Sequence, residues 1–197
     1  MTTRLLFIDT ETGGLDPFAC SLLSLGLIVW EDGKIRGKTE IFIAEPEIVA
    51  DAESRIIHGI DVVWLKSHGL APAVAVQRLE TFLALYFDVP VVPASVPLAG
   101  HNVGFDISFL RRLYRLAGSD YGRIFSHRTI DTAGILRFLS IAGVLQLDGA
   151  GSSAAFEHFG ITFGEHARHS AMGDAHATAM LFTKLIELVR QPVEIRG

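Results

Sequence analysis

The sequence predicts an α/β fold in which helices flank a mixed sheet, and three observations support this prediction. The continuous apolar run at residues 4–9 is typical of a strand buried on both faces in the middle of a sheet. Residues 21–30 and 34–44 have the pattern of a hairpin around Asp32-Gly33, so the first three strands are expected to be antiparallel neighbours. Helical and strand patterns then alternate, which favours helices packed against the sheet.

The elements expected after the hairpin follow from helical periodicity and from capping residues. Helices are expected over residues 52–59, 72–87, 106–117, 132–141, 153–159 and 171–189, and strands are expected to end near Gly100 and to span 126–130. Asp131 stands where the N-cap of a helix belongs. The last helix is expected to bury one stripe and to leave its other faces free for chemistry; the stripe comprises Met172, Ala175, Ala179, Phe182, Ile186 and Val189.

The composition limits the class of protein. With 197 residues, 49% of them apolar, the chain can bury one substantial core, and we expect a single domain over residues 1–197. Cys20 is the only cysteine, which excludes an intramolecular disulfide and a cysteine-rich zinc cluster and fits a reducing compartment. The N-terminus has no signal-peptide pattern, and no stretch approaches the roughly 18 apolar residues of a membrane span. We therefore expect a cytoplasmic protein with no membrane segment.

The formal net charge of −5 argues against a strongly basic surface that binds nucleic acid non-specifically, because phosphate affinity normally comes from Lys and Arg. It does not exclude an enzyme that acts on nucleic acid. Carboxylates that hold metal ions lower the formal charge, and the ions restore positive potential where a phosphate binds. Arg111, Arg112 and Arg115 could contact phosphates, but an exposed helix face explains them equally well.

Two carboxylates close the first expected strand. Asp9 and Glu11 are two residues apart, so the period of a strand places both side chains on the same face. Neighbouring carboxylates repel each other, and a divalent cation between them would relieve the repulsion, since hard cations take oxygen ligands. The following Thr12-Gly13-Gly14 offers exposed backbone donors and room for a strand of substrate. Taken alone, such a pair could equally well start a turn.

Two further carboxylates stand at the ends of later elements. Asp106 follows the strand expected to end near Gly100, and Asp174 lies within the first turns of the last helix. Each alone would be an ordinary acid near a helix N-terminus. Together, four carboxylates from three segments can build a two-metal phosphodiesterase site, in which the ions lie roughly 3.5–4 Å apart. A histidine side chain titrates near neutral pH, which would suit His169, shortly before Asp174, to act as a general base.

Three segments of the chain resemble the three motifs of the DEDDh, or DnaQ-like, family of 3′→5′ exonucleases. They are DTETGG at residues 9–14, HNVGFD at 101–106 and HSAMGD at 169–174. The likeness extends from residue 4 to about residue 190, with the motifs in the same order and at similar intervals as in the family. The family includes the proofreading subunit of bacterial DNA polymerase III, ribonuclease T and oligoribonuclease. Gly13, where the family commonly has Thr, and the glycine-rich stretch 148–153 depart from its pattern and put substrate preference in doubt.

The resemblance implies a ribonuclease H-like fold with a mixed five-stranded sheet, and the release of nucleoside 5′-monophosphates from a 3′ end. It also implies that Asp9, Glu11, Asp106 and Asp174 hold two Mg²⁺ or Mn²⁺ ions and that His169 activates the attacking water.

The same resemblance implies contacts with the substrate. Leu15 matches an apolar residue that wedges against the terminal bases, and the backbone near Thr12, together with Gly14, is expected to grip the 3′ end. His58 belongs to a His-Gly-Ile segment that resembles a further family segment close to the site. Asn102 is expected to help hold the substrate.

The motifs leave the substrate and the partners open. The leading hypothesis is a proofreading-type exonuclease that acts on the 3′ end of single-stranded DNA. An RNA-trimming or oligoribonucleotide-degrading exonuclease of the same fold is the close alternative, because the motifs do not report what meets the 2′ position of the sugar. A non-catalytic module that binds nucleic acid or a partner protein is disfavoured by the complete ligand set. Relatives include homodimers and polymerase subunits, so the resemblance leaves both kinds of association open.

Overall fold

Five strands form one mixed sheet in the computed structural model, which describes residues 3–89, 91–147, 151–162 and 170–190. The strands are β1 (Arg4–Thr12), β2 (Leu22–Glu31), β3 (Lys34–Phe42), β4 (Val96–Gly100) and β5 (Phe125–Asp131), in the order β3-β2-β1-β4-β5. The β1, β2 and β3 strands are antiparallel neighbours, whereas β4 is parallel to both β1 and β5. The predicted central first strand and the antiparallel arrangement of the first three strands are confirmed.

The hairpin between β2 and β3 turns where the sequence predicts it. Asp32 and Gly33 both have positive φ angles, of 47° and 87°. A two-residue hairpin loop with positive φ at both positions matches the right-handed twist of the flanking strands, and Asp-Gly is favoured there because both residues tolerate that conformation. The turn pairs the end of β2 with the start of β3, and beyond a register shift at Val29/Trp30 Gly26 of β2 lies between Asp9 of β1 and Glu40 of β3.

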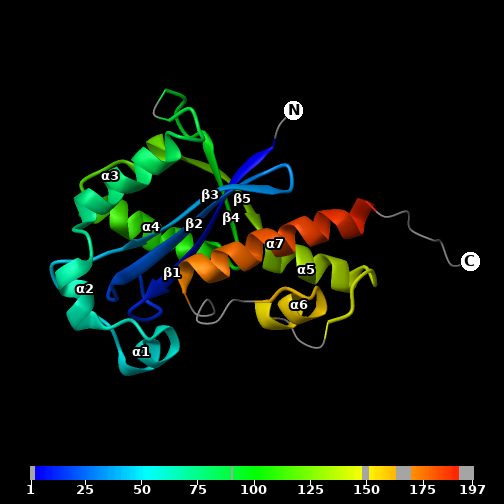
Figure 1. Cartoon of the computed structure of the whole chain (residues 1–197), viewed down its shortest axis with the longest axis horizontal. Coiled ribbons are helices and arrows are strands. Elements are labelled where there is room, and N and C mark those ends of the chain that lie inside the picture. Colours follow the sequence, from blue (N-terminus) through cyan, green and yellow to red (C-terminus); the bar gives the residue numbers. More distant parts are fainter. Residues whose placement is uncertain (1–2, 90, 148–150, 163–169, 191–197) are drawn as a thin grey trace, which may run out of the picture.

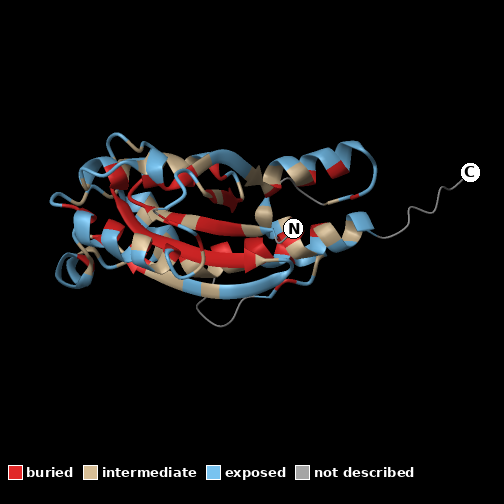
Figure 2. Cartoon of the chain, turned by 90° about the horizontal axis from the view of Figure 1, so that it is seen from above, coloured by how far each residue is buried: buried red, intermediate tan, exposed pale blue. Residues whose placement is uncertain are grey.

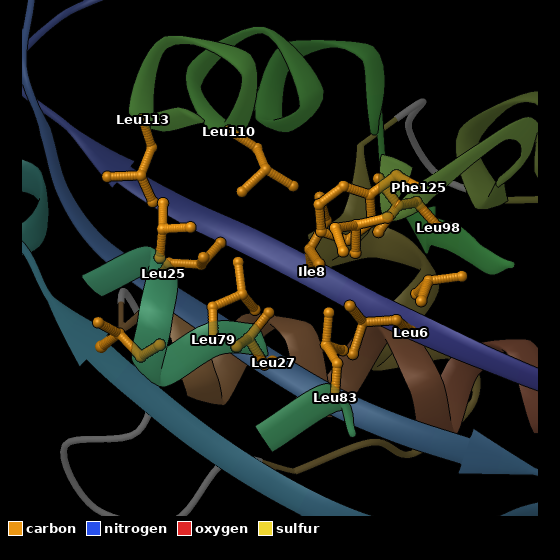
Figure 3. Close-up of a cluster of buried hydrophobic side chains, with 14 of the residues drawn as sticks. Leu6, Ile8, Leu25, Leu27, Leu79, Leu83, Leu98, Leu110, Leu113 and Phe125 are labelled. Carbon is orange, nitrogen blue, oxygen red and sulfur yellow. The ribbon is translucent and has the colours of Figure 1, made fainter. Parts of the chain in front are cut away.

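Helices cover both faces of the sheet (Figure 1). On one face, α3 (Pro72–Leu83) and α4 (Gly104–Leu116) bury leucines against the even-numbered residues of β1. Figure 3 shows this cluster, with Leu79 and Leu83 from α3 and Leu110 and Leu113 from α4 facing the strands. Each such buried side chain contributes roughly 1.5–3 kcal/mol relative to exposure. The inner strands β1, β2 and β4 are mostly buried, as the colouring in Figure 2 shows, whereas Ile41 is the only buried residue of β3.

The other face of the sheet is covered by α7 (Ala171–Arg190), whose environment differs from the prediction. Ala175, Ala179 and Phe182 pack on the sheet as the predicted stripe requires, but Val189 is 58% exposed. A second row of residues, which includes Leu181, packs against α5 (Thr132–Ile141) and α6 (Ser152–His158). The prediction that the other faces of this helix are free was wrong, because two helices close over its outer side.

The remaining elements are short. The α1 helix (Ala52–His58) agrees with the prediction. The α2 helix (Val62–His68) was not predicted, although Asp61 is its N-cap and accepts hydrogen bonds from the first backbone N–H groups of the helix. A 3₁₀ turn, η1 (Tyr121–Arg123), precedes β5. Part of the glycine-rich stretch, residues 148–150, lies outside the described residues. No helix among the described residues is long and apolar enough to span a membrane.

Candidate active site

Three of the four predicted metal ligands meet where β1 ends. Asp9 and Glu11 point to the face of the sheet that α7 covers, because they alternate with the core residues Ile8 and Thr10 on the opposite face. Asp174 lies in the first turn of α7. One carboxylate oxygen from each of Asp9, Glu11 and Asp174 lies within 4.8 Å of the other two. Segments more than 160 residues apart in the chain thus form one acidic cluster.

A glycine in β2 allows α7 to begin against the sheet. Gly26 pairs with Asp9, and a Cβ atom built on it would lie 2.2 Å from the carbonyl carbon and oxygen of Ala171 and 2.4 Å from the backbone nitrogen of Met172. A side chain therefore cannot be accommodated there without moving the start of the helix. Ser170 Oγ accepts a hydrogen bond from the Gly173 N–H at 3.2 Å, which is the pattern of an N-cap. These contacts determine where Asp174 lies.

Gly26→Ala should therefore displace the first turn of α7. We expect a loss of roughly 1–3 kcal/mol in the free energy of unfolding, as overpacking of a close-packed interior typically costs, and a loss of the increase in melting temperature on adding Mn²⁺. Gly134→Ala in α5 is the matched control, since nothing lies within 4 Å of its new Cβ atom. Thermal unfolding with and without Mn²⁺ measures both effects, and an unchanged metal response in Gly26→Ala would contradict this account of Asp174.

Asp106 is not one of the three closely spaced carboxylates, but its charge affects them. Its side chain is buried at the start of α4, and its Oδ1 atom accepts a hydrogen bond from the Thr10 hydroxyl at 2.7 Å. Burial raises the pKa of Asp106 to about 7, against the lowering effect of the Thr10 hydrogen bond. Its charge also raises the pKa values of Asp9 and Glu11. The fourth predicted ligand thus lies beside the cluster, held in a fixed orientation.

Burial and mutual repulsion make the cluster hard to ionise without a cation. Burial is the largest cause that raises the pKa of Asp9 well above its ordinary value, and the charges of Asp106, Asp174 and Glu11 add to it. For Glu11, burial followed by the charges of Asp174 and Glu40 raises the pKa to about 8. Buried carboxylates of like charge favour the proton unless an opposite charge is present.

Glu40 is a neighbour of the cluster that sequence reasoning missed. It lies on β3 in the same cross-strand row as Gly26 and Asp9, and it accepts a hydrogen bond from Ser24 Oγ at 3.1 Å. Burial raises the pKa of Glu40, while hydrogen bonds from Ser24 and from the backbone of Met172 lower it. The hairpin predicted from the sequence already includes Glu40. An acid in this register position, two strands from Asp9, could therefore have been recognised from the sequence.

The raised pKa of Glu11 gives a testable pH dependence for the metal-free protein. Because folding raises this pKa from 4.5 to about 8, the folded state binds the proton more tightly than the unfolded chain between these values. The contribution of Glu11 to the free energy of unfolding is therefore greatest at low pH and falls as the pH rises through this window. Glu11→Gln should flatten that fall. Chemical denaturation in chelator from pH 5 to 8.5 measures it, with Glu157→Gln on the exposed side of α6 as control; equal slopes in all three proteins would refute the expectation.

The donor set fits a divalent metal ion. Its three closely spaced ligand atoms are carboxylate oxygens, which hard cations such as Mg²⁺ and Mn²⁺ prefer. The charge of an ion would offset the repulsion that raises the pKa values of Asp9 and Glu11. The acidic cluster therefore matches a metal centre in both chemistry and electrostatics.

A cavity of about 360 Å³ opens beside Glu11. His58 lines it, and the His58 Nδ1 atom accepts a hydrogen bond from the Ile60 N–H at 2.9 Å. Since burial lowers the pKa of His58, the neutral ring carries its proton on Nε2, a buried atom with no hydrogen-bond partner among the described residues. This N–H is thus available to a ligand in the cavity, and Ile56 and Ile57 add apolar walls.

The other predicted substrate contacts have different environments. The Thr12 hydroxyl donates to the Gly14 carbonyl at 2.8 Å and so shapes the turn after β1. Gly14 fits because a Cβ atom there would lie 2.6 Å from Cys20 Sγ. Leu15 is 85% exposed, as a residue that contacts a ligand requires. Asn102 does not line the cavity beside Glu11; it lines a separate cavity of about 540 Å³ together with Asp131 and residues of α5.

The predicted capping residue Asp131 is confirmed, and the predicted general base lies outside the described residues. Asp131 accepts hydrogen bonds from the Ala133 and Asn102 backbone N–H groups, both at 2.9 Å. It therefore caps α5 and holds the turn after β4 rather than joining the acidic cluster. His169 precedes Ser170, the first described residue of its segment, and its role stays a prediction.

Residues 13–20 follow β1, and we call them the entrance loop. A buried ion pair holds this loop in place. From Nη1, Arg112 of α4 donates to the carbonyl oxygens of Pro17 and Phe18 at 3.1 and 3.2 Å. Its Nε and Nη2 atoms donate to the two carboxylate oxygens of Glu45 at 2.9 and 2.7 Å. The side chains of Arg112 and Glu45 are only 12% and 2% exposed. Such bidentate pairs are geometrically specific, so the loop backbone is held firmly against α4.

Comparisons with known proteins agree on the kind of protein that this geometry resembles. No family model matches the chain. The DNA polymerase III subunit epsilon-like protein of Rhodobacter capsulatus is 29% identical over 193 residues, covering 95% of this chain and 24% of that protein. The DNA polymerase III subunit epsilon of Rickettsia conorii is 28% identical over 185 residues, covering 93% of this chain and 74% of that protein.

Solved structures agree on the fold. The zinc ion bound form of an E. coli ExoI-ssDNA complex has a TM-score of 0.77 at 20% sequence identity, covering 96% of this chain and 41% of that chain. The predicted ribonuclease H-like fold, with its mixed five-stranded sheet and flanking helices, is therefore confirmed. The chain spans about a quarter of the length of the Rhodobacter capsulatus protein and about two fifths of the exonuclease I chain.

Proposed function

We propose that this chain, which belongs to the DnaQ-like family of 3′→5′ exonucleases, hydrolyses phosphodiester bonds at the 3′ end of single-stranded nucleic acid. The observation that carries the proposal is the cluster of Asp9, Glu11 and Asp174, whose oxygen atoms lie within 4.8 Å of one another at the end of β1. A cluster of this kind has little structural purpose, since its buried carboxylates repel one another.

Two Mg²⁺ or Mn²⁺ ions are the proposed cofactors. Asp9, Glu11 and Asp174 would hold one, and Asp106, oriented by the Thr10 hydroxyl, would contribute to the second. When bound, such ions neutralise phosphate charge and make water a better nucleophile. The E. coli exonuclease I complex with single-stranded DNA occurs in a zinc-bound form, which supports metal binding in this fold.

The protein's own groups would supply positioning and proton transfer. His169 would accept the proton of the attacking water, because a histidine titrates near neutral pH. The His58 Nε2–H would donate to the substrate in the cavity beside Glu11, and Leu15 would contact the terminal bases. The proposed products are nucleoside 5′-monophosphates, released by one exonuclease domain over residues 1–197.

DNA is the favoured substrate. The relatives are named as DNA polymerase III epsilon subunits, and the exonuclease I complex contains single-stranded DNA. These names also support a role beside a polymerase. Trimming of RNA by the same carboxylates is the alternative, since metal-assisted hydrolysis does not itself depend on the 2′ position of the sugar.

The test is incubation of the purified chain with single-stranded DNA and RNA of one sequence, each labelled at the 5′ end. With Mg²⁺ or Mn²⁺ we expect both labelled strands to shorten from the 3′ end, the DNA strand faster than the RNA strand. The expected products are nucleoside 5′-monophosphates. Faster shortening of RNA would select the alternative substrate. Cleavage that persists in chelator, or no cleavage of either strand, would refute the proposed function, and binding without shortening would indicate a non-catalytic module.

A further inference from the structure

We propose that Phe18 and Arg115 form a second binding subsite for single-stranded nucleic acid, in which a base stacks on the Phe18 ring and Arg115 pairs with a backbone phosphate. The subsite would bind nucleotides upstream of the 3′-terminal bond. The role of this subsite in the reaction rests on the proposed function. Its ability to bind a single strand does not.

The entrance loop presents Phe18 to solvent on a rigid backbone. The Phe18 side chain is 78% exposed. Its backbone N–H donates to Asp16 Oδ1 at 2.8 Å, and its carbonyl accepts from Arg112, which Glu45 holds in turn. A large aromatic ring fixed at the surface loses little freedom when a base stacks on it, and every base offers a face for stacking. An exposed ring on a tightly held loop is therefore suited to sequence-independent binding.

An arginine side chain lies beside this ring, and a second arginine lies one turn away on the same helix. The Arg115 guanidinium lies 5.5 Å from the Phe18 ring centroid. One turn earlier on the same face of α4, the Arg111 guanidinium lies 4.4 Å from the Tyr121 ring centroid. Among the residues that the structure describes, neither arginine forms an ion pair with a carboxylate. In a chain of net charge −5, two exposed arginines that lie beside aromatic rings complement the charge of a phosphate backbone.

The subsite lies next to the acidic cluster along both elements that carry it. The entrance loop begins directly after β1, two residues beyond Glu11. The α4 helix begins beside β1 at Asp106, and Arg115 follows nine residues later, roughly 14 Å along the helix axis at 1.5 Å per residue. Leu15 lies on the same loop, three residues before Phe18. In the proposed arrangement, a strand with its 3′ end at the carboxylates passes the end of β1 and Leu15 before it reaches Phe18.

The three arginines of α4 have different environments, although the sequence pattern does not distinguish them. Arg112 is committed to Glu45 and to the loop carbonyls, so it positions the loop and is not available to a phosphate. Arg111 and Arg115 are exposed. Of these two, Arg115 is the one that contacts the ring on the entrance loop.

The proposal is tested by binding of a fluorescent 12-nucleotide single strand in chelator, measured by anisotropy at several salt concentrations. Phe18→Ala should weaken binding about 5- to 100-fold, the range expected for one stacked base, and Phe18→Trp should restore it. Arg115→Ala should weaken binding and reduce the slope of log affinity against log salt by about 0.7, the value for one phosphate contact with a single strand. A role confined to folding would not change that slope.

Matched controls are available on exposed helix faces elsewhere in the fold. Phe138→Ala on α5, where the ring is 68% exposed, and Arg78→Ala on α3 should bind the strand like the wild type. In nuclease assays, the effect of Phe18→Ala and Arg115→Ala on KM should grow as the substrate lengthens from two nucleotides to twelve.

The outcomes separate the subsite from the proposed function. Wild-type shortening of DNA with unchanged strand affinity in both variants would overturn the subsite and leave the exonuclease intact. Loss of affinity in both variants without any metal-dependent shortening by the wild type would refute the exonuclease and leave the subsite standing. Equal weakening in the control variants would overturn the subsite.

Discussion

Asp174→Asn should lower the rate of 3′-end hydrolysis by roughly 10³-fold or more, because a bound metal ion stabilises the transition state by several kcal/mol and each 1.4 kcal/mol corresponds to tenfold in rate. The amide keeps the shape of the side chain but removes one of three charged ligands. In chelator, the same change should raise the melting temperature, because the charge of Asp174 raises the pKa values of Asp9 and Glu11.

Two measurements check this expectation. Single-turnover rates on a 5′-labelled DNA strand measure the chemistry, and thermal unfolding with and without Mn²⁺ measures metal binding. Asp88→Asn, at an exposed position outside the three motifs, is the control and should match the wild type in both. If Asp174→Asn kept wild-type turnover, or still gained stability from Mn²⁺ as the wild type does, the assignment of Asp174 as a ligand would be wrong.

His169→Ala should slow the reaction by roughly 10²–10⁴-fold, the typical contribution of a positioned general base. Metal binding should persist, since the variant leaves the three carboxylates of the acidic cluster unchanged. The rate of the wild type should rise with pH through the histidine pKa, near 6.5, and the residual rate of the variant should lose this step.

The control for this variant is His127→Ala at an exposed position of β5. Rates from pH 5.5 to 8.5 and Mn²⁺-dependent melting temperatures separate two roles for His169. Loss of the Mn²⁺ response would make it a metal ligand, and a wild-type rate would exclude it from the reaction.

Local sequence patterns were sufficient to predict the sheet and most of the acidic cluster. The apolar run before Asp9 predicts a central strand, and a period of two places Asp9 and Glu11 on one face whatever the rest of the fold. Asp131 was predicted as a cap because its hydrogen bond spans only two residues. Interactions of this kind join residues that are close together in the chain. A single sequence is therefore enough to predict them.

Contacts between distant segments could not be predicted in this way. The pairing of Arg112 with Glu45 joins residues 67 positions apart, and on a helix pattern Arg112 looks like any exposed arginine. The second buried row of α7 depends on where α5 and α6 pack, which the period of the helix does not reveal. The hydrogen bond that orients Asp106 likewise joins it to Thr10, a residue 96 positions away in the chain.

The ion pair beneath the entrance loop also restricts how this sequence can change over time. Replacing either Arg112 or Glu45 alone leaves an uncompensated charge in a nearly closed site, at a cost that reaches about 3–5 kcal/mol for fully buried pairs. That is a large fraction of the stability of a typical domain. Lysine cannot reproduce the bidentate geometry at position 112 and would still leave the Pro17 and Phe18 carbonyls poorly bound. Positions 45 and 112 are therefore expected to mutate as a pair, and the loop between Glu11 and Ser21 to change its shape when they do.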